Sequence, residues 1–246
     1  YRRMRPGINP ELEMGRFLTE IAFPNIAPLA GALEYENEGG DYTTLVLLQG
    51  FVANQGDAWS FTLDYLKRFL TDCVEQPNVV REAGEKAHAV YRLFAGTLGQ
   101  RTGELHRALA QTTGDPAFDP EPITATDMAQ WSEHIRMEVE TTFERLEQAR
   151  GQLSEPVRSL TEQVLKLRGA ASARVAPIEA LAPQVMKTRY HGDYHLGQVL
   201  VARDDVILID FEGEPSRSLA ERRAKHSPLR DVVGMLRSFD YAAHAA

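Results

Sequence analysis

The sequence has little of several features that mark common protein classes. It contains one cysteine, Cys73, so no disulfide can form within the chain. No apolar run is long enough to span a bilayer or to serve as a signal peptide. Basic residues are outnumbered, 27 against 35 acidic, and the formal net charge of -8 argues against general affinity for nucleic acid or anionic membranes. We therefore expect a reduced, cytoplasmic protein with neither nucleic-acid nor membrane partners.

What the chain does contain is typical of a globular protein. Its 246 residues, 43% of them hydrophobic, can bury a sizeable core as one large domain or two lobes. Near the start, Asn9 and Pro10 form a cap and first turn that predict a helix over Asn9 to Ala22. The run Tyr42 to Leu48 is β-branched and apolar, so we expect a strand that pairs with Ala30 to Tyr35 as a hairpin.

The middle of the chain has helical character. Apolar residues recur at helical spacing from Met128 to Leu146, and the pattern repeats from Val157 to Leu167. We interpret both stripes as parts of a hydrophobic core rather than as cofactor contacts. Between helices, the proline-containing segment Gly114 to Ile123 is predicted to be a loop.

The C-terminal third returns to strand character before it ends in a helix. Short β-favouring runs occur at Lys187 to Tyr190, Gln198 to Val201 and Val206 to Ile209, separated by turn residues. A helix is then expected over Pro228 to Ala246. Its predicted apolar side comprises Leu229, Val232, Val233, Leu236 and Phe239.

The residues with the clearest chemical pattern lie between these strands. Asp193 belongs to the run His191-Gly-Asp-Tyr-His-Leu-Gly-Gln198, and Asp210 opens Asp210-Phe-Glu-Gly-Glu-Pro215 one strand later. Phosphoryl transfer needs an aspartate near the attacking hydroxyl, a side-chain oxygen for a metal, and a carboxylate that joins magnesium to the phosphates. Asp193, Gln198 and Asp210 provide these groups in order.

Those two runs resemble the catalytic and metal loops of the aminoglycoside phosphotransferase-like kinases. The longer agreement is with bacterial maltokinases, through Leu219-Ala-Glu-Arg-Arg223, Ser227 to Tyr241, Tyr1 to Pro10 and the run Leu98-Gly-Gln-Arg-Thr-Gly-Glu-Leu-His106. The resemblance implies an α+β, protein-kinase-like bilobal fold. Residues 1–52 would form a partial N-lobe of one helix and antiparallel strands, and residues 53–246 a mainly helical C-lobe with a small β region at the catalytic loop.

The resemblance also implies an activity. A maltokinase transfers phosphate from ATP to the anomeric hydroxyl of maltose with the help of Mg²⁺, giving maltose 1-phosphate, and it occurs alone or fused to trehalose synthase. The expected cofactors are thus ATP and Mg²⁺, and the expected partners are maltose or a related sugar and a fused or associated trehalose synthase.

Residue roles follow from the matched positions. Asp193 matches the catalytic base, and Gln198 and Asp210 match the metal ligands. His191 is expected to contact the sugar. Asp231 resembles the buried aspartate that braces the catalytic loop through backbone hydrogen bonds.

The N-terminal part is expected to contribute to the ATP site. Glu13, rather than Glu11, would pair with the phosphate-binding lysine, and Gln49-Gly50-Phe51-Val52 would offer backbone groups to adenine. The chain contains neither the glycine-rich hairpin nor the lysine that should precede this glutamate helix. The resemblance would place both upstream of Tyr1, and further helices of the sugar site after Ala246, so we expect a fragment of a longer kinase.

Other interpretations stay open at this stage. The chain could serve as a noncatalytic kinase-like module of a fused enzyme, or as another small-molecule kinase that acts on glucosamine or an aminoglycoside. His191, Asp193, His195 and Asp210 could instead be a metal-hydrolase cluster. The basic residues Arg217, Arg222, Arg223 and Lys225 are more typical of a solvated face than of a phosphate site.

Overall fold

The computed structural model describes residues 5–179 and 184–246. The chain forms two compact units, Tyr1–Pro120 with Thr188–Ala246, and Glu121–Lys187. The predicted boundary at residue 52 falls inside the first unit, where the N–H of Leu208 donates to the carbonyl oxygen of Asn25 at 2.8 Å and joins the N-terminal part to a strand late in the chain. None of the described helices has the length and apolarity needed to cross a membrane.

The first unit begins with the predicted helix, α1 (Pro10–Glu20). The side-chain oxygen of Asn9 accepts hydrogen bonds from the backbone N–H groups of Glu11 and Leu12, at 2.9 and 3.1 Å. This cap satisfies donors that have no partner within the helix. One face of α1 is buried and contributes Met14, Phe17 and Leu18 to the core.

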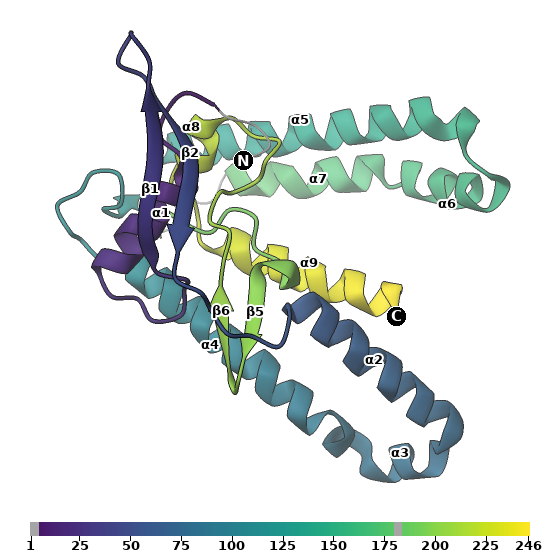
Figure 1. Cartoon of the computed structure of the whole chain (residues 1–246). Coiled ribbons are helices and arrows are strands. Elements are labelled where there is room, and N and C mark those ends of the chain that lie inside the picture. The colour runs from purple at the N-terminus through teal and green to yellow at the C-terminus, as the bar shows by residue number, and fades with distance from the viewer. Residues whose placement is uncertain (1–4, 180–183) are drawn as a thin grey trace. The chain divides into compact units, whose positions relative to one another are not determined.

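Strands β1 (Leu29–Glu36) and β2 (Tyr42–Gln49) form the predicted antiparallel hairpin (Figure 1). The side chain of Asn37 organises the turn by accepting from the N–H groups of Gly39 and Asp41, each at 2.9 Å. Two register shifts bend β1 against β2.

Helices make up most of the rest of the first unit. Their bounds are α2 (Ala58–Glu75), α3 (Pro77–Ala83), η1 (Gly84–His88), α4 (Ala89–Leu109), α8 (Leu219–Arg223) and α9 (Leu229–Ala245). Helix α4 is central to the core, because Leu98, Leu105 and Leu109 on one side of it are fully buried. The predicted apolar side of α9 is partly wrong. Leu229, Val233 and Leu236 are exposed, since the helix directs Asp231, Met235 and Ser238 inward instead.

The small β region of the C-terminal third consists of β5 (Val199–Ala202) and β6 (Asp205–Leu208), joined by a tight turn in which Arg203 has a φ of 58°. Val199, Val206 and Leu208 alternate inward and are buried. The strand predicted over Lys187 to Tyr190 is shorter in the structure: β-strand pairing with Glu121 and Pro122 ends at Lys187, and Thr188 continues only as an isolated antiparallel bridge to His226.

The described residues of the second unit form a short antiparallel sheet and three α-helices. Its elements are β3 (Glu121–Pro122), α5 (Ala125–Ala149), η2 (Arg150–Gln152), α6 (Glu155–Leu165), α7 (Arg168–Glu179) and β4 (Met186–Lys187). Strand β3 lies at the end of the segment predicted as a loop. Within this unit α5 and α7 lie side by side (Figure 1).

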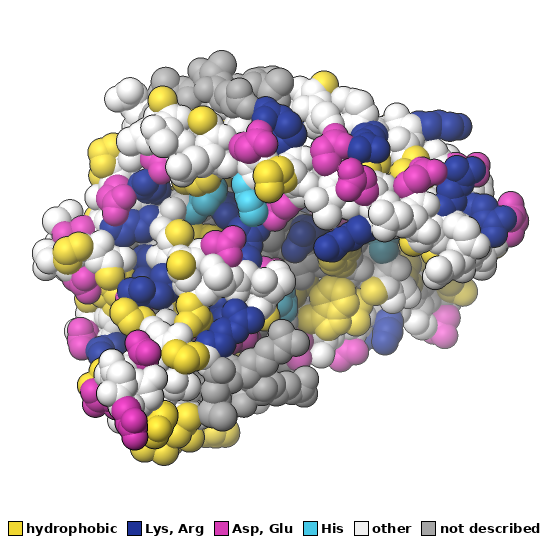
Figure 2. Space-filling view, turned by 90° about the horizontal axis from the view of Figure 1, so that it is seen from above, with side chains coloured by type: hydrophobic (Ala, Val, Ile, Leu, Met, Phe, Trp, Pro, Cys, Tyr) yellow, Lys and Arg dark blue, Asp and Glu magenta, His cyan; other side chains and the backbone are white. Residues whose placement is uncertain are grey.

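The predicted core stripe from Val157 to Leu167 is wrong. Val157, Leu160, Val164 and Leu167 are all exposed, because no described element of their own unit covers this face of α6. Figure 2 shows hydrophobic side chains that reach the surface between charged ones. Helical periodicity identifies an apolar face but not the element that covers it.

Candidate active site

The catalytic loop predicted around Asp193 is braced by a buried carboxylate. Asp231, at the start of α9, accepts hydrogen bonds from the N–H groups of His191 and Gly192, at 2.9 and 3.0 Å. The Nε2 atom of His106, from α4, lies 3.0 Å from the same carboxylate. With its side chain 1% exposed, Asp231 depends on these partners to offset its loss of hydration. These are the backbone hydrogen bonds that the resemblance implied.

The side chain of His191 lies inside the protein. Its Nε2–H donates to the carbonyl oxygen of Ile209 at 2.9 Å, which leaves Nδ1 to accept the N–H of Asp193 at 3.4 Å. Burial lowers the pKa of His191 despite the nearby Asp231 charge, so the ring is neutral. The ring is buried and links the catalytic loop to the segment that precedes Asp210, so this geometry gives no support to a sugar contact of His191, which stays a prediction.

The two predicted metal ligands meet at one end of the β5–β6 hairpin. Gln198 directly precedes β5, and Asp210 follows β6 by two residues. The side-chain Nε2 of Gln198 donates to Asp210 Oδ2 at 2.7 Å. The main-chain carbonyl oxygen of Gln198 accepts the N–H of Ile209 at 3.0 Å. Asp210 has a φ of 64°, a left-handed backbone that costs energy for a residue with a Cβ and is often found at functional sites.

This donor set suits a hard divalent cation. The amide nitrogen of Gln198 faces the carboxylate, so the amide oxygen and the second carboxylate oxygen of Asp210 are the atoms that could bind a metal ion. Magnesium prefers such oxygen ligands and retains several water molecules, so two protein side chains are enough.

Asp193 lies in a partly buried, acidic environment. Burial raises its pKa, the charges of Glu214 and Asp210 act in the same direction, and His195 opposes them. The His195 Nε2 atom is 4.0 Å from Asp193 Oδ2. A carboxylate whose pKa is raised accepts a proton more readily, as a general base requires.

The metal-hydrolase alternative loses its support in this geometry. The ring of His191 is committed to a backbone carbonyl, and His195 Nδ1 accepts the N–H of Gly197 at 3.1 Å. Across residues 5–179 and 184–246, no three His, Cys, Asp or Glu side chains gather in a way that could hold a metal ion.

The catalytic and metal loops approach each other closely. A Cβ added to Gly192, which has a φ of 89°, would lie 3.2 Å from the Cα of Gly213 in the metal loop. On the opposite side, a Cβ added to Gly234 of α9 would lie only 2.7 Å from the carbonyl oxygen of Tyr194. Glycine at these positions lets the two loops and α9 pack backbone against backbone.

Glu13 lies in contact with two arginines rather than in open solvent. Arg189 Nη1 is 2.7 Å from Glu13 Oε2, and Arg223 contributes Nε at 2.8 Å and Nη2 at 2.6 Å. Burial acts to raise the pKa of Glu13, but the two arginines outweigh it and lower the pKa. The predicted pairing of Glu13 with a phosphate-binding lysine stays a prediction.

The basic residues near α8 hold parts of the unit together instead of forming a solvated face. Besides the pair between Arg223 and Glu13, Arg222 Nη1 donates to the carbonyl oxygen of Glu212 at 3.1 Å. Lys225 Nζ donates to the carbonyl oxygen of Pro116 at 2.7 Å. The solvated-face interpretation is thus wrong for Arg222, whose side chain is buried.

The segment predicted to meet adenine has one backbone donor already in use. The N–H of Gly50 donates to the carbonyl oxygen of Pro28 at 2.8 Å, so among the backbone groups of Gly50 the carbonyl oxygen is the one left for the predicted contact with adenine. Phe51 is 93% exposed, and the Val52 carbonyl oxygen accepts from Asn54 Nδ2 at 2.9 Å. The contribution of Gln49, Phe51 and Val52 to ATP binding stays a prediction.

Sequence reasoning missed the contacts that helix α4 makes with the catalytic loop. Thr102 Oγ1 donates to the Leu98 carbonyl oxygen at 2.8 Å, so the hydroxyl of Tyr194, also 2.8 Å away, is the donor to Thr102. The contact of His106 with Asp231 joins residues 125 positions apart. The run Leu98 to His106 was the available signal, but the resemblance attached no role to its side chains.

Known proteins share both the sequence pattern and the fold. A glucosamine kinase of Streptacidiphilus jiangxiensis is 28% identical over 205 residues, which cover 83% of this chain and 40% of that protein. A glucosamine kinase of Mycolicibacterium smegmatis (strain ATCC 700084 / mc(2)155) is 28% identical over 217 residues, 88% of this chain and 47% of that protein. The chain thus spans less than half the length of these relatives.

Solved structures of glucosamine kinases have a similar fold. A glucosamine kinase in complex with glucosamine, ADP and inorganic phosphate aligns with a TM-score of 0.69 and 24% identity, over 98% of this chain and 50% of that one. Another, described as crystal form B, gives a TM-score of 0.69 and 23% identity. The predicted α+β, protein-kinase-like fold is therefore confirmed.

The sequence profile of the phosphotransferase enzyme family (APH) matches residues 5–213. Because this match spans most of the chain and includes Asp193, Gln198 and Asp210, the chain belongs to the phosphotransferase enzyme family.

Proposed function

We propose that this chain carries the catalytic and metal loops of an ATP- and magnesium-dependent kinase that phosphorylates a hydroxyl group of an amino sugar of the glucosamine type. The observation that carries the proposal is the meeting of Gln198 and Asp210 at 2.7 Å beside the braced loop of Asp193. Phosphoryl transfer requires this combination of a base and two oxygen ligands.

In the proposed reaction the sugar hydroxyl oxygen attacks the γ-phosphorus of ATP and ADP leaves. Asp193 orients the hydroxyl and accepts its proton, and the burial that raises its pKa supports this role. Gln198 and Asp210 would hold the magnesium ion, which when bound neutralises charge on the phosphates. Asp231 keeps the backbone at His191 and Gly192 in place, so that the base does not have to be ordered during the reaction.

The choice of glucosamine rests on the relatives, which are named glucosamine kinases. Maltose, the acceptor implied by the resemblance of the longer motifs, is the second candidate. The two relatives give it no support, and neither do they support a trehalose synthase partner. Sugar hydroxyls are bound by similar polar groups in unrelated sites, so the acceptor has to be tested directly.

A coupled ADP-release assay on the full-length protein, with ATP, Mg²⁺ and either glucosamine or maltose, tests the proposal. We expect glucosamine to stimulate ADP release more than maltose, and Asp193→Asn to lower the stimulated rate by about a hundredfold or more. Asp240→Asn, the same chemical change at an exposed site of α9, should leave the rate unchanged.

The outcomes separate the alternatives. Stimulation by maltose alone would support the maltokinase interpretation. A rate that Asp193→Asn leaves unaltered refutes the catalytic assignment. Absence of ADP release, together with no change in thermal stability when ATP and Mg²⁺ are added, would favour a noncatalytic module.

A further inference from the structure

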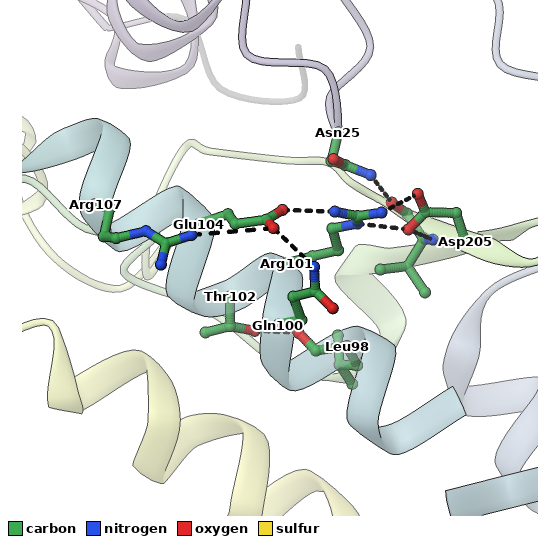
Figure 3. Close-up of polar contacts among 9 residues, drawn as sticks. Asn25, Leu98, Gln100, Arg101, Thr102, Glu104, Arg107 and Asp205 are labelled. Atoms are coloured by element: carbon green, nitrogen blue, oxygen red, sulfur yellow. Dashed lines mark hydrogen bonds and ion pairs between the residues drawn. The ribbon is translucent and has the colours of Figure 1, made fainter. Parts of the chain in front are cut away.

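The run Leu98 to His106 of helix α4 combines core leucines with polar side chains that the proposed reaction does not use directly. Figure 3 shows Arg101 of this run extending toward Asp205, which opens strand β6. This contact joins residues 104 positions apart and so connects two elements that are distant in the sequence.

Arg101 is bound from two sides in a planar geometry. Its Nε and Nη2 atoms donate to the two carboxylate oxygens of Asp205, at 2.8 and 2.7 Å, and its Nη1 donates to Glu104 Oε2 at 2.7 Å. Such a two-pronged arginine–carboxylate pair fixes direction as well as distance. The hydrogen bond from Arg101 is the largest of the effects that lower the pKa of Asp205, so the carboxylate stays charged in this contact.

Asp205 is connected to the metal loop by one short strand. Strand β6 runs from Asp205 to Leu208, and Asp210 follows two residues later. We call the Arg101–Asp205 pair the clamp. At about 3.3 Å per strand residue, Asp205 of the clamp and the metal ligand Asp210 lie at the two ends of a segment roughly 17 Å long. Asn25 holds the same strand, since its Nδ2 donates to the Val206 carbonyl oxygen at 2.9 Å.

The same helix also holds the catalytic loop. One turn apart on α4, Thr102 accepts a hydrogen bond from Tyr194, and His106 contacts Asp231, at 2.8 and 3.0 Å. Tyr194 adjoins the predicted base, and Asp231 binds the backbone of the loop. Helix α4 is therefore attached both to the loop of Asp193 and to the strand of Asp210.

We propose that Arg101 is a positioning residue for phosphoryl transfer: by clamping Asp205 to α4, it sets the place of Asp210 and Gln198 relative to the catalytic loop. This inference rests on the proposed function, because it gives Asp210 and Gln198 the task of holding the metal. Without this ion pair, the β5–β6 hairpin keeps its strand pairing and the buried contacts of Val206 and Leu208, but it loses the hydrogen bonds that fix its Asp205 end to α4.

Binding of Mn²⁺ and ADP to the full-length protein, measured by electron paramagnetic resonance of the Mn²⁺ ion, tests the proposal without relying on turnover. We expect Arg101→Gln to weaken the binding of Mn²⁺ and ADP about tenfold. This is the lower end of the loss in metal affinity, about 10- to 100-fold, that follows when a residue orienting a metal ligand is replaced. Arg101→Lys keeps the charge but not the planar fork, so its loss should be partial. Arg107→Gln is the matched control on the same helix, because that side chain is 79% exposed, and its affinity should equal that of the wild type.

A double-mutant cycle separates positioning from general destabilisation. Arg101→Gln combined with Asp205→Asn should bind Mn²⁺ and ADP no more weakly than Arg101→Gln alone, because both changes break one clamp. Asp205→Asn is nearly isosteric and its side chain is 38% exposed, so it supplies the answer should Arg101→Gln fail to fold.

The controls distinguish failure of this inference from failure of the proposed function. If the wild type binds Mn²⁺ and ADP, Asp210→Asn abolishes binding, and the clamp variants bind as tightly as the wild type, then Arg101 is not a positioning residue and the proposed function stands. If the wild type does not bind, or Asp210→Asn binds unchanged, the metal assignment is wrong and the role of Arg101 is refuted with it.

Discussion

Replacing Glu13 by Gln removes the negative charge that neutralises a buried arginine. The side chain of Arg189 is 2% exposed and that of Glu13 is 13% exposed, whereas Arg223 is 30% exposed and can turn toward water. Breaking a buried ion pair by removing one partner costs about 3–5 kcal/mol. The amide of the variant still offers one oxygen to Arg189, and Arg223 can rehydrate, so we expect a loss near the lower end, about 3 kcal/mol.

Urea unfolding at pH 7 measures this loss. The chain has two tryptophans, Trp59 in the first unit and Trp131 in the second, so a Trp131→Phe background makes the fluorescence report on the unit that contains Glu13. Glu20→Gln, the same change at an exposed end of α1, should shift the free energy of unfolding by less than about 0.5 kcal/mol.

The sign of the pH dependence follows from the lowered pKa. The folded-state pKa of Glu13 is below its ordinary value of 4.5, so its stabilising effect is complete above that value and is lost as the pH falls through the folded-state pKa. The stability difference between wild type and Glu13→Gln should thus shrink in acid. Adding Arg189→Met to Glu13→Gln should restore part of the loss, because no unpaired charge is then buried. A loss below 1 kcal/mol at pH 7, or no recovery in the double variant, would refute the reasoning.

Two further predictions test local packing and capping. Gly234→Ala places a Cβ 2.7 Å from the Tyr194 carbonyl oxygen, so thermal unfolding should show that the protein is less stable by about 1–3 kcal/mol. Gly96→Ala, at an exposed position of α4 where a Cβ meets nothing within 4 Å, should be neutral or stabilise the protein by up to about 1 kcal/mol. Equal effects of the two substitutions would contradict the close approach at Gly234. In the second unit, burial opposes the charged form of Asp127, but Lys187 at 2.6 Å and the capping contacts of Thr124 outweigh it and lower the pKa to about 2. Asp127→Asn should therefore lower the free energy of unfolding by about 1–2 kcal/mol at neutral pH, measured by Trp131 fluorescence in a Trp59→Phe background. The stability difference from wild type should disappear as the pH falls through about 2, where Asp127 takes up a proton. A stability difference that persists below that pH would show that the charge of Asp127 is not its source.

Local chemistry in the sequence determined the elements and the order of the reactive groups. Asn9 caps α1 and Asn37 organises the hairpin turn through bonds that span four residues or fewer, so a short stretch of sequence is enough to predict them. Gln198 and Asp210 are separated by one two-stranded hairpin, and strand pairing alone brings them together. For this reason the predicted metal ligands are adjacent in the structure.

Only the tertiary structure decided which partner each buried group has. Glu13 meets arginines 176 and 210 residues away, and the catalytic loop is braced from α4 and α9, so no spacing rule could link them. The exposure of Val157 and Leu229 was mispredicted for the same reason. The sequence states how polar or apolar a side chain is and on which face of a helix it lies, but burial depends on what packs against that face, and distant segments supply that.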